Sequence, residues 1–156
     1  MEIRFAEERD IPGLDRLLLQ VLTVHHNRRP DLFKGNCRKY TDDELRGIIR
    51  DPERPILVAA DEGGEVMGYA FCVLQHHPND NILTDIKTLY IDDLCVDEVL
   101  RGKRVGTALY EAALDLARKR GCYNVTLNVW SCNEAATRFY EKCGLKPQKV
   151  GMEKIL

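Results

Sequence analysis

The pattern of apolar and polar positions predicts strands in the first, middle and last parts of the chain. Met1–Ala6 is expected to form a first strand, and the short apolar run Ile56–Ala60 has the length and composition of a buried strand. Asp61–Gly64 is a turn sequence, and Val66–Leu74 follows it as the second strand of a hairpin. Further strands are expected at Thr88–Val96, Tyr123–Val129 and Gln148–Ile155.

Apolar residues at helical spacing, together with capping signals, predict four helices. The first follows Asp10, a residue type that caps helices, and its pattern fades near His25–Pro30. The second opens on the capping box Thr41–Glu44. The third stops at Gly121 after three cations, and the fourth stops at Gly144. The apolar positions on these faces are Leu14, Leu17, Leu18, Val21 and Leu22 in the first helix, Val105, Leu109, Ala112 and Leu116 in the third, and Ala136, Phe139, Tyr140 and Cys143 in the fourth.

This order of elements predicts a single α/β domain over residues 1–156. The chain has the length of one domain with one core, and it contains no linker or internal repeat. A mixed, mostly antiparallel central sheet with helices on both faces accommodates the predicted elements. Strand–helix–strand units near the C-terminus imply a parallel pair of strands there.

Composition narrows the classes of partner. The net charge of −2 disfavours nucleic acid, which requires a surplus of Lys and Arg. No apolar run reaches the roughly 18 residues of a membrane span, and the N-terminus lacks the apolar stretch of a signal peptide. We therefore expect a cytoplasmic protein that uses neither membrane nor nucleic acid. The six cysteines show no metal-binding spacing and are expected to be free, mostly buried thiols: Cys37, Cys72, Cys95, Cys122, Cys132 and Cys143.

The segment after the predicted strand Thr88–Val96 has the features of an anion site. A helix is expected to begin within Arg101–Thr107, and the first N–H groups of a helix have no partner inside it. Gly102 and Gly106 let the backbone approach a pyrophosphate closely. Alone, the segment is equally consistent with a basic helix start in solvent. The candidate binding residues are Arg101, Gly102, Lys103, Arg104, Val105, Gly106 and Thr107.

Two motifs together resemble those of the GNAT acetyltransferase superfamily. Arg101 and Gly106 match the signature Q/R-x-x-G-x-G/A for acetyl-CoA binding, whereas Arg104 stands where its first glycine is usual. If Arg104 is already right-handed helical, arginine costs little there and keeps the needed N–H, whereas a positive φ would strain its backbone. Downstream, Asn133–Leu145 is similar to the family pattern N-x-x-A-x-x-F-Y-x-x-x-G-F/L. The resemblance is close over Leu89–Leu156. It implies a single GNAT-like domain that uses acetyl-CoA as co-substrate, without a metal.

The resemblance also implies the residues that carry the chemistry. Tyr140 occupies the place of the family's catalytic tyrosine, which protonates the leaving thiolate, although its helix alone also fits a core aromatic. Asp92 and Asp93 interrupt an apolar strand, where alternation would direct them to opposite faces. The run resembles the L-Y-L-E-D strand of spermidine/spermine acetyltransferases, so Asp92 is expected to act as the base and Asp93 to orient it or bind a cation. The alternative is one Asp in solvent and the other in a salt bridge.

Other residues are expected around the cofactor. By the resemblance, the backbone of Leu94, Cys95 and Val96 lies along the pantetheine arm, with the Cys95 N–H near the thioester carbonyl. Asn133 either bonds the cofactor or, like Ser131, caps the last helix. The segment His25–Lys34 is a candidate substrate lip. The adjacent histidines at 25–26 and 76–77 are interpreted as surface or rim residues, because neighbours in a strand cannot share one metal.

The sequence therefore predicts transfer of an acetyl group from acetyl-CoA to a primary amine by direct attack. Two aspartates near the thioester favour a small cationic amine such as a polyamine. A protein N-terminus or lysine is the runner-up acceptor, and an amino acid or aminoglycoside stays open. A non-catalytic acyl-CoA sensor is the competing class, while nucleotide-binding motifs are absent. Dimers are common in the family, so a homodimer is one expected assembly.

Overall fold

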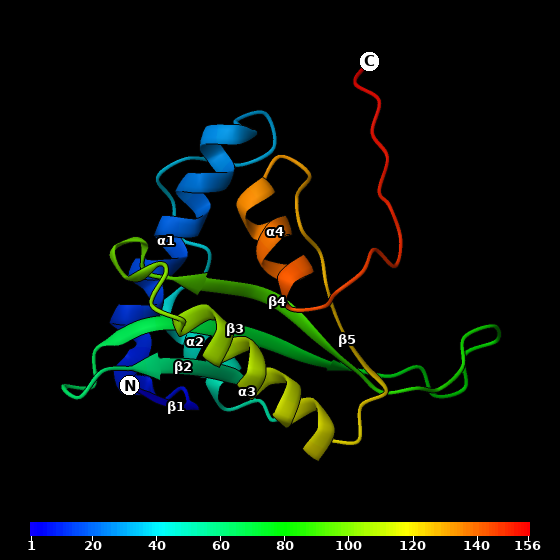
Figure 1. Ribbon diagram of the computed structural model, residues 1–156, viewed down its shortest axis with the longest axis horizontal. Coiled ribbons are helices and arrows are strands. Elements are labelled where there is room, and N and C mark those ends of the chain that lie inside the picture. Colours follow the sequence, from blue (N-terminus) through cyan, green and yellow to red (C-terminus); the bar gives the residue numbers. More distant parts are fainter.

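The computed structural model describes residues 1–156, which form one five-stranded sheet (Figure 1). The strands lie in sequence order, and the first four pair antiparallel with their neighbours. The last two pair in parallel, because a helix crosses between them. The strands are β1 (Glu2–Phe5), β2 (Ile56–Ala60), β3 (Val66–Gln75), β4 (Thr88–Val96) and β5 (Asn124–Leu127).

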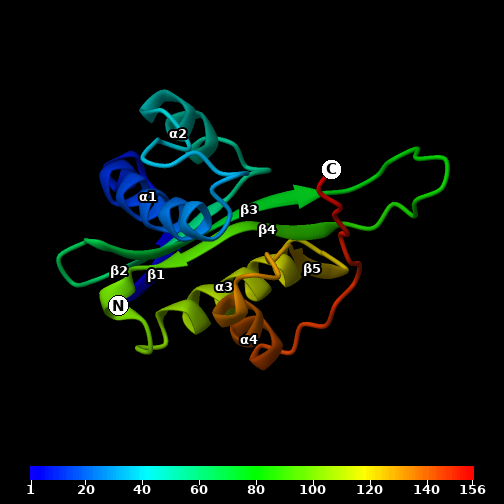
Figure 2. The same ribbon diagram turned by 90° about the horizontal axis from the view of Figure 1, so that it is seen from above.

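Helices cover both faces of the sheet, as the predicted α/β class requires (Figure 2). On one face lie α1 (Ile11–Arg28) and α2 (Asp42–Ile49), and on the other lie α3 (Val105–Lys119) and α4 (Glu134–Lys142). Two 3₁₀ turns, η1 (Glu8–Asp10) and η2 (Glu98–Leu100), precede α1 and α3. None of the helices combines the length and apolar character that crossing a bilayer needs.

Each face of the sheet has its own buried cluster. Under α1 and α2, Leu14 and Leu17 pack with Tyr69 and Phe71 of β3. Alternate strand positions point to the other face, where residues such as Leu89 pack under α3. Each fully buried aliphatic side chain contributes about 1.5–3 kcal/mol, so the two clusters fix the position of β3 and β4 between the helix layers.

The predicted bounds hold best in the middle of the sheet. The strands Ile56–Ala60 and Thr88–Val96 are found as predicted, and the capping box at Thr41 opens α2. α1 begins directly after Asp10, as predicted, but the Asp10 side chain makes no capping hydrogen bond to this helix. Its carboxylate instead accepts hydrogen bonds from the Arg4 guanidinium at 2.7 and 2.9 Å and ties β1 to η1.

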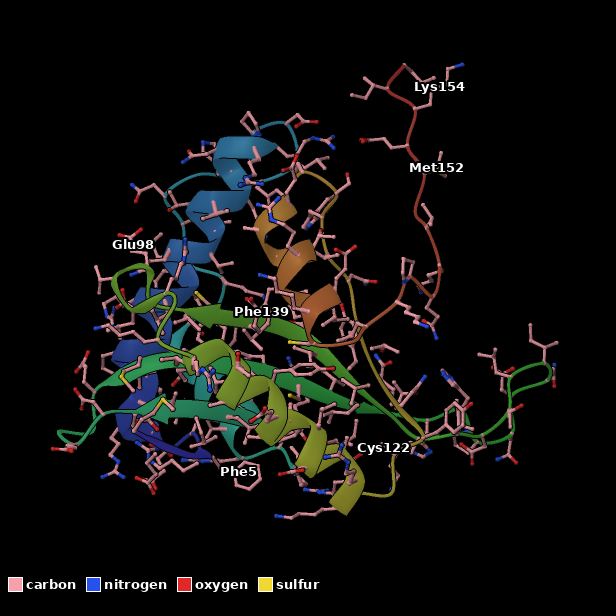
Figure 3. The ribbon with its side chains drawn as sticks, viewed as in Figure 1. Phe5, Glu98, Cys122, Phe139, Met152 and Lys154 are labelled. Carbon is pink, nitrogen blue, oxygen red and sulfur yellow. The ribbon has the colours of Figure 1, made fainter.

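The predicted final strand at Gln148–Ile155 is wrong. The segment runs away from the sheet without strand pairing, and the side chains of Met152 and Lys154 point outward (Figure 3). Met152 is 90% exposed, so its apolar side chain buries nothing that could hold a strand in place. Instead the Glu153 carboxylate pairs with Arg29 at 2.8 Å, near the end of α1. Alternating residues form a strand only where a neighbouring edge accepts their hydrogen bonds.

Candidate active site

A bulge in β4 shapes the centre of the candidate site. Asp93 pairs with Phe71 of β3, but the next pair along joins Ile91 with Cys72, so Asp92 is an extra residue without a partner in β3. Such bulges break the two-residue alternation of a strand and redirect its side chains. The bulge lies where two carboxylates follow one another in the middle of the sheet.

Both carboxylates reach the same ammonium group. Lys39 Nζ lies 3.3 Å from Asp92 Oδ2 and 3.5 Å from Asp93 Oδ2. The prediction that alternation directs Asp92 and Asp93 to opposite faces is therefore wrong, and the extra residue of the bulge is the physical reason. The structure brings the two candidate acid–base residues together.

The two carboxylates have different surroundings. The side chain of Asp93 is 12% exposed and that of Asp92 is 36% exposed. The Tyr69 hydroxyl donates a hydrogen bond of 3.2 Å to Asp93 Oδ2. Burial raises the pKa of Asp93 above the ordinary value of a carboxyl, although the Lys39 ammonium opposes this shift. The raised pKa makes Asp93 a stronger proton acceptor than an ordinary carboxylate, which suits a general base.

Lys39 stays charged in this position. Burial disfavours its ammonium form, but the negative charges of Asp93 and Asp92 outweigh burial and raise the pKa of Lys39 above its ordinary value. Nothing in the hydrophobic pattern pointed to this lysine, because it lies in an irregular loop between α1 and α2. The contact joins residues 53 positions apart in the sequence.

Tyr140 on α4 has an accessible hydroxyl beside this cluster. The hydroxyl makes no hydrogen bond within the chain, and no buried side-chain oxygen lacks a partner, so solvent or a ligand can reach it. Burial of the ring, followed by the charge of Asp93, raises the pKa of Tyr140 above its ordinary value. The tyrosine therefore holds its proton at neutral pH.

Phe139 takes the core position that was the alternative interpretation of Tyr140. Its ring packs against the buried cluster under α3, and Figure 3 shows it on the inner side of α4. The two rings meet edge to face, with centroids 5.2 Å apart. Phe139 therefore anchors α4 to the core, while the Tyr140 ring is not part of that cluster.

The sheet opens between β4 and β5 next to these residues. Their pairing ends at Ile91 and Leu127, and the chain after β5 diverges from β4 (Figure 1). The Asp97 N–H donates to the Met67 carbonyl at 2.9 Å, which sets the alternation of hydrogen-bonding groups along β4. By that alternation, the backbone groups of Leu94 and Val96 point into the opening.

The same alternation changes the expectation for Cys95. Its N–H points to Tyr69 in β3 rather than into the opening, so the free amides for a thioester are those of Leu94 and Val96. The Cys95 thiol is buried and lies 3.7 Å from the Leu17 carbonyl of α1. Burial raises its pKa to about 12, which leaves it unreactive at neutral pH.

The start of α3 has the predicted features of an anion site. Arg104 precedes the helix, whose first turn contains no acidic residue and receives no side-chain cap. Arg101, Lys103 and Arg104 are exposed and take part in none of the salt bridges of the structure. Unpartnered N–H groups and three unpaired cations therefore face solvent at the positive end of a helix.

Arg104 adopts the strained conformation. Its φ of 64° and ψ of 8° lie in the left-handed region, and Gly102 has a φ of 84°. A left-handed conformation costs a non-glycine residue roughly 1–2 kcal/mol. This conformation explains why glycine is usual at this position in the signature Q/R-x-x-G-x-G/A, because glycine adopts a positive φ without strain.

Gly106, in the first of the two sequence motifs, lies against Phe139 of the second. A Cβ added at this position would lie 3.4 Å from Val96 Cγ2 and 3.5 Å from Phe139 Cζ. These distances are close to ordinary contact, so glycine or alanine fits here and a larger side chain does not. The small residue brings the start of α3 against both β4 and α4.

Asn133 caps α4. Its side-chain oxygen accepts a hydrogen bond from the Ala136 N–H at 3.3 Å, whereas Ser131 makes no such bond. A contact between Asn133 and the cofactor stays a prediction. In the predicted lip His25–Lys34, Phe33 packs edge to face on Trp130, which follows β5, with centroids 5.3 Å apart.

His25 also lies at this lip. Its ring is 5.0 Å from that of Phe33, and burial lowers the pKa of His25 against the opposing charge of Asp93. His25 is therefore neutral at neutral pH. No group of three or more His, Cys, Asp or Glu residues is arranged to hold a metal, and all six cysteines are free.

Comparison with known proteins decides the family. The model of the "Acetyltransferase (GNAT) family" matches residues 21–145. The chain belongs to this family. A solved structure of a single-site mutant of the BH1408 protein from Bacillus halodurans is similar to it over 100% of this chain and 99% of that one, with a TM-score of 0.96 and 31% identity.

Two curated relatives of this GNAT chain act on different acceptors. A glucosamine 6-phosphate N-acetyltransferase from Arabidopsis thaliana is 37% identical over 44% of this chain and 44% of its own length. The peptidyl-lysine N-acetyltransferase YjaB from Escherichia coli is 31% identical over 74% of this chain and 65% of its own. The chain thus spans less than two thirds of the length of either relative. The spermidine/spermine branch is not represented among these two.

Proposed function

We propose that this protein transfers an acetyl group from acetyl-CoA to the primary amine of a small cationic molecule. The observation that carries the proposal is the pair of carboxylates, Asp92 and Asp93, that meet at one ammonium just beyond the point where the β4–β5 pairing ends. Tyr140 lies close enough for the charge of Asp93 to raise its pKa. Membership of the GNAT family supplies the reaction class. Polyamines are included among the proposed acceptors because the site presents two carboxylates.

The two ends of acetyl-CoA would bind to different elements. The pyrophosphate fits the start of α3, where free N–H groups and the side chains of Arg101, Lys103 and Arg104 supply positive charge. The pantetheine arm would lie in the opening, with its amides against the free backbone groups of Leu94 and Val96. Asn133, Val105 and Thr107 complete the proposed cofactor contacts, and the Cys95 backbone supports this strand from the β3 side.

The acceptor would bind and lose its proton at the bulge. Asp92, the more exposed carboxylate, holds the incoming ammonium. Asp93, whose pKa burial raises, takes the proton and leaves a neutral amine that can attack the thioester. This division reverses the roles implied by the spermidine/spermine resemblance, because the buried member of the pair is Asp93.

The tetrahedral intermediate needs hydrogen-bond donors that stabilise its oxyanion, and its collapse needs an acid that protonates the leaving thiolate. The proposed donors to the oxyanion are the N–H groups of Leu94 and Val96, which by the alternation along β4 do not pair with β3. Tyr140, protonated at neutral pH, gives its proton to the departing thiolate of CoA. The attacking nitrogen loses its second proton, which restores Tyr140 through solvent, and Asp93 releases its proton to solvent. The products are the N-acetylated amine and CoA.

Release of CoA thiol across a panel of amines tests the proposal. The panel contains a polyamine, an amino sugar phosphate, an aminoglycoside, a lysine peptide and a neutral primary amine of similar size. We expect the highest kcat/KM for the small polycationic amine and the lowest for the neutral one. Absence of thiol release with every amine would contradict the enzymatic proposal and favour an acyl-CoA sensor.

A protein lysine is the second candidate acceptor. YjaB, which is similar to this chain over most of its length, is a peptidyl-lysine acetyltransferase. In this chain the acidic pair already holds the ammonium of a peptide-linked lysine, Lys39. A higher kcat/KM for the lysine peptide than for the polyamine in the same panel would favour this candidate.

A further inference from the structure

Lys39 meets the recognition requirements that the proposed site places on its acceptor. Its Nζ lies 3.3 Å from Asp92 and 3.5 Å from Asp93, the carboxylates proposed to bind and deprotonate the substrate amine. No other cation of the chain forms a salt bridge with either aspartate. The primary amine nearest to the proposed chemistry therefore belongs to the protein itself.

The loop around Lys39 is held in this place on both sides. Before it, the Arg38 guanidinium pairs with Asp15 of α1 at 2.9 Å and with Asp42 of α2 at 2.6 Å. After it, the Tyr40 ring stacks on Phe71, the partner of Asp93 in β3, with centroids 5.9 Å apart. These contacts fix the backbone on both sides of Lys39, so its side chain extends over the bulge.

The side chain of Lys39 also keeps access to solvent. It is 37% exposed and lies over the Tyr40 ring, with Nζ 5.3 Å from the ring centroid. A long, flexible side chain anchored only by its ammonium can move by rotation about its own bonds. The amine can therefore approach a thioester bound in the opening between β4 and β5 while its backbone stays fixed.

We infer that Lys39 is a self-acetylation site: in the presence of acetyl-CoA, the chain transfers an acetyl group to its own Lys39 Nζ. The inference rests on the proposed function, because it uses the same carboxylates and the same acid. The effective concentration of a tethered amine makes this reaction compete with that of any free acceptor.

The step balances without a further reactant. The Lys39 ammonium gives one proton to Asp93, and the neutral Nζ attacks the acetyl carbonyl of acetyl-CoA. A C–N bond forms and the C–S bond breaks, and the thiolate takes a proton from Tyr140. The nitrogen then loses a second proton, which reprotonates Tyr140 through solvent. Asp93 releases its proton to solvent. The products are Nε-acetyl-Lys39 and CoA, and the acidic pair loses its resident positive charge.

The test is site-resolved mass spectrometry of the full chain after incubation with acetyl-CoA that carries a deuterated acetyl group. Lys119 serves as an internal control, because it is exposed at the C-terminal end of α3, outside the proposed site, and forms no salt bridge. We expect label to accumulate on Lys39 at least about tenfold faster than on Lys119. Equal rates at the two lysines would show simple chemical acetylation and overturn the inference.

Two further measurements identify the route. The first-order rate of Lys39 labelling should not change with protein concentration, whereas a rate that rises with concentration would overturn transfer within one chain. In the Tyr140→Phe variant the label on Lys39 should fall while that on Lys119 stays the same. In the Lys39→Arg variant, whose side chain keeps the positive charge, the corresponding label should be absent.

The outcome for Lys39 is separable from that for the proposed function. Thiol release with the amine panel is measured on the same preparation of the unmodified chain. Turnover of free amines without label on Lys39 would overturn self-acetylation and leave the proposed function standing. Absence of both would overturn the two together.

Discussion

At the scale of single residues, the site depends on how differently two adjacent carboxylates are solvated. Asp92 and Asp93 both pair with the Lys39 ammonium, yet Asp93 is nearly buried and accepts a hydrogen bond from the Tyr69 hydroxyl. Sequence patterns could name both aspartates and Tyr140, because carboxylates in an apolar strand and an F-Y pair are visible in one dimension. Lys39 could not be predicted, since its contact depends on a loop whose path is set by tertiary anchors.

The pKa of Asp93 predicts the low-pH side of the activity profile. Burial raises this pKa, so Asp93 becomes protonated, and inactive as a base, at a higher pH than an ordinary carboxyl. The kcat/KM for a cationic amine should therefore fall as pH decreases through the raised value. In Asp93→Asn this limb should disappear together with most of the activity. In Asp92→Asn, the matched control, it should persist, with a higher KM for the amine.

A pH–rate series of the three proteins between mildly acidic and mildly basic pH checks this assignment. An unchanged acidic limb in Asp93→Asn, together with its loss in Asp92→Asn, would assign the base to Asp92 instead.

At the scale of elements, two local irregularities create the site on a regular frame. β4 has the bounds that its apolar run predicts, but its bulge cannot be read from that run, because the extra residue is defined only by pairing with β3. The start of α3 was predictable as an anion site from its glycines and cations. The conformation of Arg104 was left open by the sequence, because a non-glycine residue rarely adopts a positive φ.

The strain at Arg104 predicts a difference between two substitutions. Arg104→Gly and Arg104→Ala both remove the guanidinium, but only glycine adopts a φ of 64° without steric cost. We expect the glycine variant to have a free energy of unfolding about 1 kcal/mol higher than the alanine variant. Urea denaturation of both variants measures the difference, and affinity for CoA should fall equally in the two. Equal stabilities would show that the left-handed conformation is not strained.

At the scale of the whole molecule, the sheet holds two helix layers that meet around its open end. The α/β class, the mixed sheet and the helices on both faces followed from the order of the predicted elements. The conformation of the C-terminal segment could not be predicted in this way. Its alternating pattern is typical of a strand, but no strand edge pairs with it. Likewise, the Phe33–Trp130 contact joins segments distant in the sequence. The homodimer stays a prediction.

Hydrogen exchange tests this picture of the molecule. The segment Gln148–Leu156 contains no helix or strand, so its amides should exchange at rates close to those of an unstructured peptide. The amides shared by β3 and β4 should be the most protected, because these strands lie between both buried clusters. Strong protection in Gln148–Leu156 would mean that this segment pairs with a strand edge in solution.

Removal of the Tyr140 hydroxyl tests the proposed acetyl transfer at its decisive step. We expect Tyr140→Phe to lower kcat at saturating acetyl-CoA and amine by roughly 10²-fold or more, because the thiolate loses its acid. The dissociation constant for CoA, measured by calorimetry on the same variant, should stay the same, since the proposed cofactor contacts on β4, on α3 and at Asn133 are unchanged. An unchanged kcat would contradict the role of Tyr140 and with it the proposed site.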